Sequence, residues 1–499
     1  MGDSVDVRSF TRQDRTRFRL QVGRCLDALA TMLAEGQFDV SEPQLGLEIE
    51  LNLVDDAGDP AMSNEAVLEA IANPAFQTEL GQFNIEINVA PRPLDGQGIG
   101  QLETTLRMAL NAADERARSA GSGLAMIGML PTLDEHHFTE QWISADPRYG
   151  MLGQQVLAAR GEDIELQLDG RSLREGGRRE TLDIVCDTIL PEAACTSVQL
   201  HLQIPPEEFA SYWNSAQAIA GVQVALAANS PFFAGRALWH ETRIPMFEQA
   251  TDTRPQELKN QGVRPRVWFG ERWITSIFDL FEENSRYFPA LLPVWTQEDP
   301  FQVLARGESP ALSELRMHNG TIYRWNRPIY DVGEGGHHLR LENRVLPGGP
   351  SVADVLADAA FYYGLVRSLA DADRPLWSQM TFDAAEENLH SAARDGIESR
   401  LYWPEMGWVG PRELVLRRLL PAAAEGLDAY GVDADVRDRY LGIIEQRCLT
   451  GRNGAVWQRE QVAAREAAGE SRSAALHGML AEYLQRMHEG EPVHTWWDR

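Results

Sequence analysis

The 499-residue sequence contains few cysteines and almost no lysine, and both shortages limit its chemistry. Its four cysteines are Cys25, Cys186, Cys195 and Cys448, and none stands in a C-x-x-C pair. The pattern therefore supports neither a zinc knuckle nor a thioredoxin-like motif. So few cysteines in so long a chain fit a reducing compartment, and we expect a cytoplasmic protein. Lys259 is the single lysine among 46 basic residues, so any phosphate binding would depend on arginine.

Long apolar runs and nucleotide-binding motifs are also missing. The N-terminus has no apolar signal region, and no run of about 18 apolar residues occurs, so we expect no membrane span and no membrane partner. The sequence has no P-loop motif, no dinucleotide fingerprint after a strand and no G-x-S-x-G elbow. Its net charge of -28 argues against nucleic acid as a partner, because phosphates favour a basic surface.

Helical and strand patterns are both present, which predicts a mixed α+β protein. Helical periodicity predicts helices at 14–35, 101–119 and 212–230 and a mostly helical chain from 351 onward. Residues 124–130 are typical of a short apolar strand. The aromatic-, Pro- and Arg-rich segment 231–337 is predicted to form long ordered loops, and 155–195 is interpreted as an insertion.

The sequence contains no repeat and no flexible Gly/Ser linker, so we predict one unit rather than tethered domains. The expected parts are an N-terminal helix packed on the core (1–39), a central domain (40–375) and a helical C-terminal region packed on that domain (376–499).

Four segments alternate between apolar and polar residues, as half-buried strands do. They are 45–54, 83–89, 197–204 and 338–346. Their polar positions carry carboxylates, carboxamides, imidazoles and guanidiniums: Glu48, Glu50, Asn52, Asn84, Glu86, Asn88, Gln199, His201, Gln203, His338, Arg340, Glu342 and Arg344.

A solvent-facing side of an antiparallel sheet would explain any one of these strands. However, Glu and Asn are disfavoured in strands, where Thr or Tyr would suit a merely wet face better. If the strands pair, four carboxylates share one surface, and they repel one another unless cations neutralise them. Oxygen-rich sites suit Mg²⁺ or Mn²⁺, and nearby arginines suit phosphate or carboxylate. We hypothesise a metal–phosphate site on the sheet.

Two tandem histidine pairs, His136–His137 and His337–His338, are weaker candidates. Adjacent side chains in a strand point to opposite faces, so neither pair is predicted to share a metal ion. The glycines at 333, 335 and 336 precede a strand rather than a helix, which favours a plain loop.

The polar strands, taken in order, resemble the glutamate–cysteine ligase and carboxylate–amine ligase family over roughly residues 40–375. The segments that carry the resemblance are GLEIELNLVD, FNIEINVAP, TSVQLHLQI, ALAANSPFFAG and LRLENRVLPGGPS, with RNGAVWQRE at 452–460 as a less specific match. The resemblance implies a glutamine-synthetase-like catalytic domain: a curved, mainly antiparallel sheet with the active site on one face, helices on the other, and a helical C-terminal layer.

The resemblance also implies a reaction. ATP would phosphorylate the γ-carboxylate of a glutamate-like acid, and an amine such as cysteine would attack the acyl phosphate to give a γ-glutamyl amide. The implied roles are metal binding by Glu48, Glu50, Glu86 and Glu342 (Mg²⁺, with Mn²⁺ an alternative), nucleotide contacts by Gln199 and His201, phosphoryl stabilisation by Arg344 and Arg340, and substrate binding by Arg243 and Arg327.

Several alternatives stay open. The segment 318–331 departs from the family pattern and is either a packed aromatic loop or a substrate rim in which Arg324 or Arg327 meets an anion. The partners are expected to be small molecules, and self-association into a homo-oligomer is left open. The same fold and mechanism could serve another amine or acid. A catalytically inactive ATP-binding regulator is less favoured, because all four metal carboxylates are present.

Overall fold

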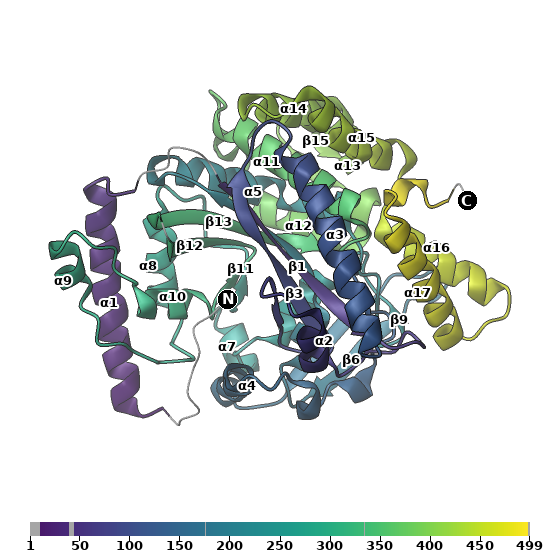
Figure 1. Cartoon of the computed structure of the whole chain (residues 1–499), viewed down its shortest axis with the longest axis horizontal. Coiled ribbons are helices and arrows are strands. Elements are labelled where there is room, and N and C mark those ends of the chain that lie inside the picture. Colours follow the sequence, from purple (N-terminus) through teal and green to yellow (C-terminus); the bar gives the residue numbers. More distant parts are fainter. Residues whose placement is uncertain (1–9, 39–43, 175, 334, 498–499) are drawn as a thin grey trace.

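A seven-stranded sheet forms the centre of the protein, which we describe from a computed structural model covering residues 10–38, 44–174, 176–333 and 335–497 (Figure 1). The strand order is β12 (Asn326–Gly333), β13 (Gly336–Pro347), β7 (Ser197–Gln203), β1 (Gln44–Val54), β3 (Asn84–Pro93) and β2 (Phe76–Thr78), with β4 (Gly123–Ala125) also paired to β1. All these pairings are antiparallel. The predicted α+β fold with a curved antiparallel sheet is confirmed.

One face of the sheet is apolar and is covered by helices. In β1 the side chains of Leu45, Leu47, Ile49, Leu51 and Leu53 are all buried. Helices α5 (Pro206–Ala227) and α11 (Val352–Ala370) pack against this face, and α3 (Gly98–Ser119) lies beside α11. A second helical layer of α12 (Phe382–Asp395), α14 (Leu420–Ala429) and α15 (Ala434–Thr450) packs on α5 and α11 (Figure 1).

A chain of buried amides fastens α5 to the two strands at one edge of the sheet. Gln223 exchanges hydrogen bonds of 3.1 and 3.2 Å with Asn343 of β13. Asn343 donates to Asn326 of β12 at 2.8 Å, and Asn326 donates to Gln217 of α5 at 2.7 Å. Because buried amides are costly when unpaired, this chain fixes where β12 and β13 lie along the helix.

Asn229, in the A-N-S-P-F segment, joins distant parts of the chain. Its side-chain amide donates to the Gly348 carbonyl at 2.7 Å and to the Tyr483 hydroxyl at 2.8 Å. Its carbonyl oxygen accepts from Gln458 at 2.8 Å. Asn229 is fully buried. The turn after β13 and the C-terminal helices α16 (Gly454–Ala467) and α17 (Arg472–Glu489) therefore meet at one amide group.

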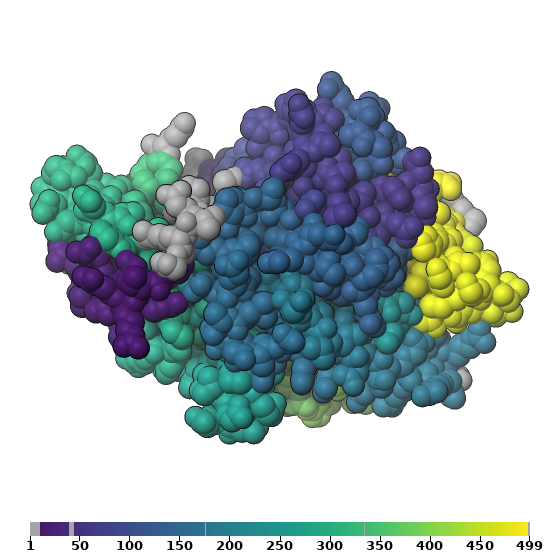
Figure 2. All heavy atoms as spheres, turned by 90° about the horizontal axis from the view of Figure 1, so that it is seen from below, coloured from purple at the N-terminus to yellow at the C-terminus, as the bar shows by residue number. Residues whose placement is uncertain are grey.

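The two ends of the chain belong to the same hydrophobic core. Helix α1 (Arg12–Ala34) begins with a capping box between Thr11 and Asp14 and packs on α8 (Ile277–Tyr287) and α10 (Ser313–Asn319). Figure 2 shows α1 in purple and the C-terminal residues in yellow at opposite ends of the molecule. One continuous apolar cluster runs from Phe18 to Trp496. The three-part division stays a prediction, and its first boundary, at residues 39–40, lies outside the described residues.

The segment 231–337 is not a set of long loops, so that prediction was wrong. It contains α6 (Arg243–Ala250), α7 (Gln256–Asn260), α8, α9 (Pro300–Ala305), α10 and the edge strand β12. Strand β12 lies at the edge of the sheet, where Pro328 is tolerated although it has no backbone N–H to donate. Because proline usually argues against a strand, sequence analysis did not predict β12.

The apolar segment 124–130, predicted to be a strand, contributes only to the short β4. Smaller elements complete the described part of the chain. The others are α2 (Asn64–Ile71), α4 (Pro147–Arg160), β5 (Ile164–Asp169), β6 (Thr181–Cys186), β8 (Phe232–Phe233), β9 (Arg236–Ala237), β10 (Val267–Trp268), β11 (Tyr323–Arg324), β14 (Leu401–Trp403), β15 (Gly407–Val409) and α13 (Pro411–Leu414). Among the described residues, no helix combines the length and apolar character needed to cross a membrane.

Replacing Asn343 with Ala is expected to lower the free energy of unfolding by about 3 kcal/mol, because Gln223 and Asn326 each lose a buried partner. Chemical denaturation of the wild type and N343A measures this difference. Asn260→Ala, in exposed α7, is the matched control and should change stability by less than about 0.5 kcal/mol. A similar loss in both variants would contradict the proposed role of the amide chain.

His390 of α12 and Glu248 of α6 form a pH-sensitive link, with 3.0 Å between Nε2 and Oε1. Burial lowers the pKa of His390, but the hydrogen bond and charge of Glu248 outweigh it and raise that pKa to about 9. The folded-state pKa is therefore above the unfolded value. The link contributes about 1 kcal/mol below pH 6.5, and this is lost as pH rises through about 9. Thermal melts should show this alkaline loss in the wild type and a smaller one in His390→Gln; equal losses would refute it.

Candidate active site

Strand pairing places the polar positions of five strands on one face of the sheet. Glu50 of β1 is directly opposite Glu86 of β3, and Glu48 is opposite Gln199 of β7. Glu342 of β13 is flanked by His201 of β7 on one side and by Arg327 of β12 on the other. The predicted polar faces therefore merge into one surface.

Glu342 is the most strongly paired carboxylate of this surface. Arg327 donates to it through two nitrogens, at 2.5 Å from Nε and 3.0 Å from Nη2, and Arg344 Nη1 donates at 3.3 Å. Burial alone would raise the pKa of Glu342, but Arg327 and Arg344 hold that pKa well below its usual range. Glu342 is therefore a buried anion with two guanidinium partners.

His201 lies between two carboxylates. Its Nε2 is 3.1 Å from Glu48 Oε1 and 4.0 Å from Glu342 Oε1, and one ligand atom from each of the three residues fits within 4.8 Å. Burial raises the pKa of Glu48, but His201 outweighs burial and lowers that pKa to about 2. Two carboxylates and an imidazole form a donor set that suits a divalent cation.

Glu50, Glu86 and Glu79 form a second acidic cluster. Burial raises the pKa of Glu79 well above its usual range, and the charges of Glu86 and Glu50 add to this. Burial and Glu48 raise the pKa of Glu86 to about 6. Such crowded carboxylates stay ionised together only when positive charge lies among them. All-oxygen donors of this kind fit Mg²⁺, so the residues present suit the metal that the family resemblance implies.

Gln199 and Arg344 fix the orientation of Glu50. Gln199 Nε2 donates to Glu50 Oε1 at 2.9 Å, and the Ser197 backbone N–H donates to Oε2 at 2.6 Å. Arg344 Nη1 donates to the Gln199 carbonyl oxygen at 2.5 Å. The β7–β13 register is irregular between Asn343 and Leu346, next to Arg344, and such bulges redirect side chains.

Among the described residues, two large cavities open on this face, and Glu48 lines both. The first, of about 600 Å³, is polar. Its walls include Glu50, Glu79, Glu86, Arg148, Tyr149, Glu192, Gln199, Arg243, Tyr323, Arg327 and Arg344. The second, of about 640 Å³, has apolar walls. They include Pro74, Ala75, Ala90 and Pro91, with His201, Arg340 and the glycines of the β12–β13 turn at its rim.

The predicted site residues divide between the cavities. Gln199 and Arg344 line the first, whereas His201 and Arg340 line the second. Arg340 donates to Asp331 at 3.0 Å and to His201 Nδ1 at 3.2 Å. Arg344 and Arg340 were both predicted to stabilise the phosphoryl group, but Arg344 lines the first cavity and Arg340 lines the second.

Arg243 lines the first cavity, but its guanidinium is largely occupied by protein groups. It is 2% exposed, and its Nε donates to Glu241 at 3.2 Å. Its Nη2 donates to the Val345 carbonyl at 2.5 Å. Arg324 and Arg327 were the two alternative anion ligands of segment 318–331. Arg324 is fully buried, pairs with Glu283 at 3.0 Å and lines neither cavity. Arg327 lines the first cavity.

Sequence analysis missed Glu79, Glu192, Arg148 and Tyr149, which also line the first cavity. Glu79 follows the three-residue β2, which is too short for alternation to be visible. Burial raises the pKa of Glu192 to about 8, and its Oε2 has no hydrogen-bond partner in the described structure. These residues lie outside the alternating strands, so no periodic signal marks them.

Comparison with known proteins agrees with this architecture. No protein of curated function matches the sequence. A glutamate–cysteine ligase from Francisella tularensis, solved in complex with AMP, has a TM-score of 0.53 at 13% identity over 92% of this chain and 93% of its own. A bifunctional glutathione synthetase from Pasteurella multocida has a TM-score of 0.50 at 11% identity, over 95% of this chain but 56% of its own.

These likenesses establish the fold, and the family is shown by sequence. The model of glutamate-cysteine ligase family 2 matches residues 44–477, which is most of the chain, and supports carboxylate–amine ligase activity. This protein belongs to glutamate-cysteine ligase family 2.

Proposed function

We propose that the protein is an ATP- and Mg²⁺-dependent ligase that joins the side-chain carboxylate of a glutamate-like acid to an amine. The observation that supports it best is the band of carboxylates between two cavities of different polarity. Such a band can hold cations where a nucleotide phosphate meets a carboxylic acid.

We assign the nucleotide to the second cavity and the acid and the amine to the first. The apolar walls of the second suit a nucleotide base, with His201 and Arg340 toward its phosphates. The AMP bound by the Francisella ligase supports adenine nucleotide as the ligand. The first cavity, with its arginines and amides, suits the acid and the amine. Gln199 is accordingly reassigned from the nucleotide to the acid.

The reaction has two steps. A carboxylate oxygen of the acid attacks the γ-phosphorus, and ADP leaves. The amine nitrogen then attacks the acyl carbon, the bond to the phosphate oxygen breaks, and phosphate leaves. Arg344 faces the first cavity from among the carboxylates, where it can neutralise charge on the transferring group.

The metal would be held by Glu48, Glu50, Glu79, Glu86 and Glu342. When bound, Mg²⁺ supplies positive charge that offsets the phosphate charge during transfer. The protein's own contribution is placement: Gln199 and the Ser197 N–H orient Glu50, while Arg327 orients Glu342.

Glu192 is the group we assign to the amine. It lines the first cavity, and its unpartnered oxygen and pKa of about 8 suit a carboxylate that accepts the proton released as the amine attacks. Glutamate and cysteine are the favoured acid and amine, since the family is named for them. Another acid or amine would keep the same residues in the same roles.

The direct test measures ADP release with Mg²⁺, ATP and L-glutamate while single amines are varied, with mass spectrometry of the product. ADP release that requires both glutamate and cysteine, with a γ-glutamylcysteine mass, is the expected result. ADP release that requires another acid and amine would support the same mechanism with different substrates. ATP binding without turnover for any pair would refute the ligase proposal.

Glu79→Gln is expected to raise the Mg²⁺ concentration for half-maximal turnover by at least about tenfold. Without metal the variant should melt no lower than the wild type, because removing one crowded carboxylate relieves repulsion. Glu65→Gln, in exposed α2, is the control and should change neither quantity. An unchanged Mg²⁺ requirement in Glu79→Gln would remove Glu79 from the metal site.

Glu192→Gln is expected to lower kcat about a hundredfold with little change in the KM for ATP, because the amine would lose its proton acceptor. Steady-state kinetics and a thermal melt check this. A variant that loses ATP affinity to the same extent would place Glu192 in a structural role.

A further inference from the structure

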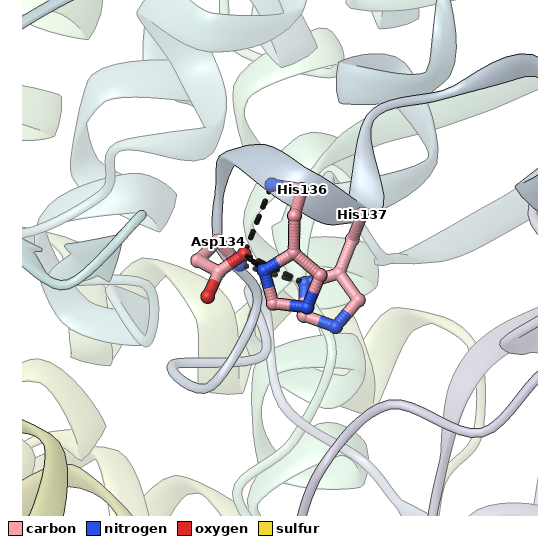
Figure 3. Close-up of side chains that lie close together, drawn as sticks. All are labelled: Asp134, His136 and His137. Atoms are coloured by element: carbon pink, nitrogen blue, oxygen red, sulfur yellow. Dashed lines mark hydrogen bonds and ion pairs between the residues drawn. The ribbon is translucent and has the colours of Figure 1, made fainter.

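Figure 3 shows the side chains of Asp134, His136 and His137 gathered around one point. None of the three lines either of the two cavities described above. Sequence analysis predicted that the two histidines would diverge, as in a strand, and that prediction was wrong. They lie in a 3₁₀ turn, η1 (Glu135–His137), and both rings face Asp134. By contrast, His337 and His338 do lie in a strand, where His337 contacts Gln37 and His338 contacts Arg340.

The three side chains bring one ligand atom each close enough together to share one metal ion, although His136 Nδ1 and Asp134 Oδ1 would have to separate for an ion to enter. Asp134 Oδ1 is 3.2 Å from His137 Nδ1 and also pairs with His136 Nδ1. The ligand atoms of all three residues lie within 4.8 Å of one another. Ligands about 2.0–2.1 Å from a tetrahedral zinc ion are about 3.3 Å apart, which is close to the Asp134–His137 separation.

The turn holds these groups in place before any ion arrives. Asp134 Oδ1 accepts the His136 backbone N–H at 3.0 Å, which orients the carboxylate. Neighbouring Leu133 and Phe138 are buried in the core. The His137 ring meets Trp142 edge-on, with 4.8 Å between centroids. Fixed orientation and an apolar neighbour are what metal-binding histidines require of their surroundings.

His137 is prepared to act as a neutral ligand. The Asp134 backbone N–H donates to His137 Nδ1 at 3.1 Å, so this nitrogen carries a lone pair on the side of the carboxylate. A metal ion would take this lone pair in place of the backbone N–H.

Helix capping explains only part of the arrangement. It accounts for the bonds from the His136 N–H to Asp134 and from the Asp134 N–H to His137 Nδ1, but not for the approach of the two imidazoles, which are tilted by 35° with centroids 3.8 Å apart. The His136 side chain is 71% exposed and could extend into solvent, yet it lies against His137. Two imidazoles and one carboxylate favour zinc-like ions over Mg²⁺, which prefers oxygen ligands.

We propose that Asp134, His136 and His137 bind one divalent transition metal ion of the zinc class, with the fourth position open to solvent. All three ligands belong to residues 134–137, so the bound ion would fix the η1 turn and, with it, the contact between His137 and Trp142. The turn between β2 and β3 contacts the following residues through Gln82, which donates to the Gln141 and Ile143 carbonyls, and through Phe83, which packs on Trp142. The site does not depend on the ligase reaction.

The test uses the full-length protein, stripped of metal and then titrated with Zn²⁺ or Co²⁺ in excess Mg²⁺. The wild type should bind one equivalent that His136→Ala does not bind, with affinity lowered by more than about 100-fold in the variant. The wild-type Co²⁺ complex should show the intense visible absorption of a tetrahedral site. Zn²⁺ should raise the melting temperature of the wild type but not of His136→Ala.

Two matched variants separate this site from other binding. Glu48→Gln alters the sheet carboxylates and should leave the intense Co²⁺ band unchanged. His488→Ala removes another partly exposed histidine and should also leave it unchanged. The proposal fails if His136→Ala binds the same number of equivalents with wild-type affinity. It also fails if His488→Ala loses the band, because exposed histidines would then be binding the metal without a defined site.

Discussion

Repulsion among carboxylates on one sheet face is the constraint around which this structure is built. Glu50 and Glu86 are directly opposite each other, a pairing of like charges that destabilises a sheet. Arg327 and Arg344 neutralise the charge of Glu342 and lower its pKa. Burial and neighbouring carboxylates raise the pKa values of Glu79 and Glu86. The stabilising free energy must therefore come from the opposite face, where α5 and α11 bury an apolar surface and the amide chain from Gln217 to Asn343 fixes the position of α5 on the sheet.

The alternating pattern was sufficient to predict the strands and the face on which the acids lie. With a period of two, a strand has only two faces, so Glu48, Glu50, Glu86 and Glu342 had to share a surface once their strands joined one sheet. The pattern could not reveal Glu79 or Glu192. The first follows a three-residue strand, and the second lies in a 3₁₀ turn, η3 (Leu190–Ala194). Their positions depend on tertiary neighbours.

The sequence also could not divide the face into two cavities. Gln199 and His201 are two residues apart on one strand, and they were given one role. In the structure Gln199 contacts Glu50 and Arg344, while His201 contacts Glu48 and Arg340. Glu48 lines both cavities, and its position between them does not follow from local spacing.

Asn229 has a consequence for how the protein is made. Its amide binds the Tyr483 hydroxyl, 254 residues further along the chain, and that hydroxyl donates to the Met126 carbonyl. A nascent chain halted before residue 483 leaves a buried amide without its partner and part of the apolar core uncovered. Ribosomal synthesis is slow relative to collapse, so the central sheet passes through an exposed, aggregation-prone stage until α17 emerges. Truncated products of this gene would be substrates for chaperones and proteases.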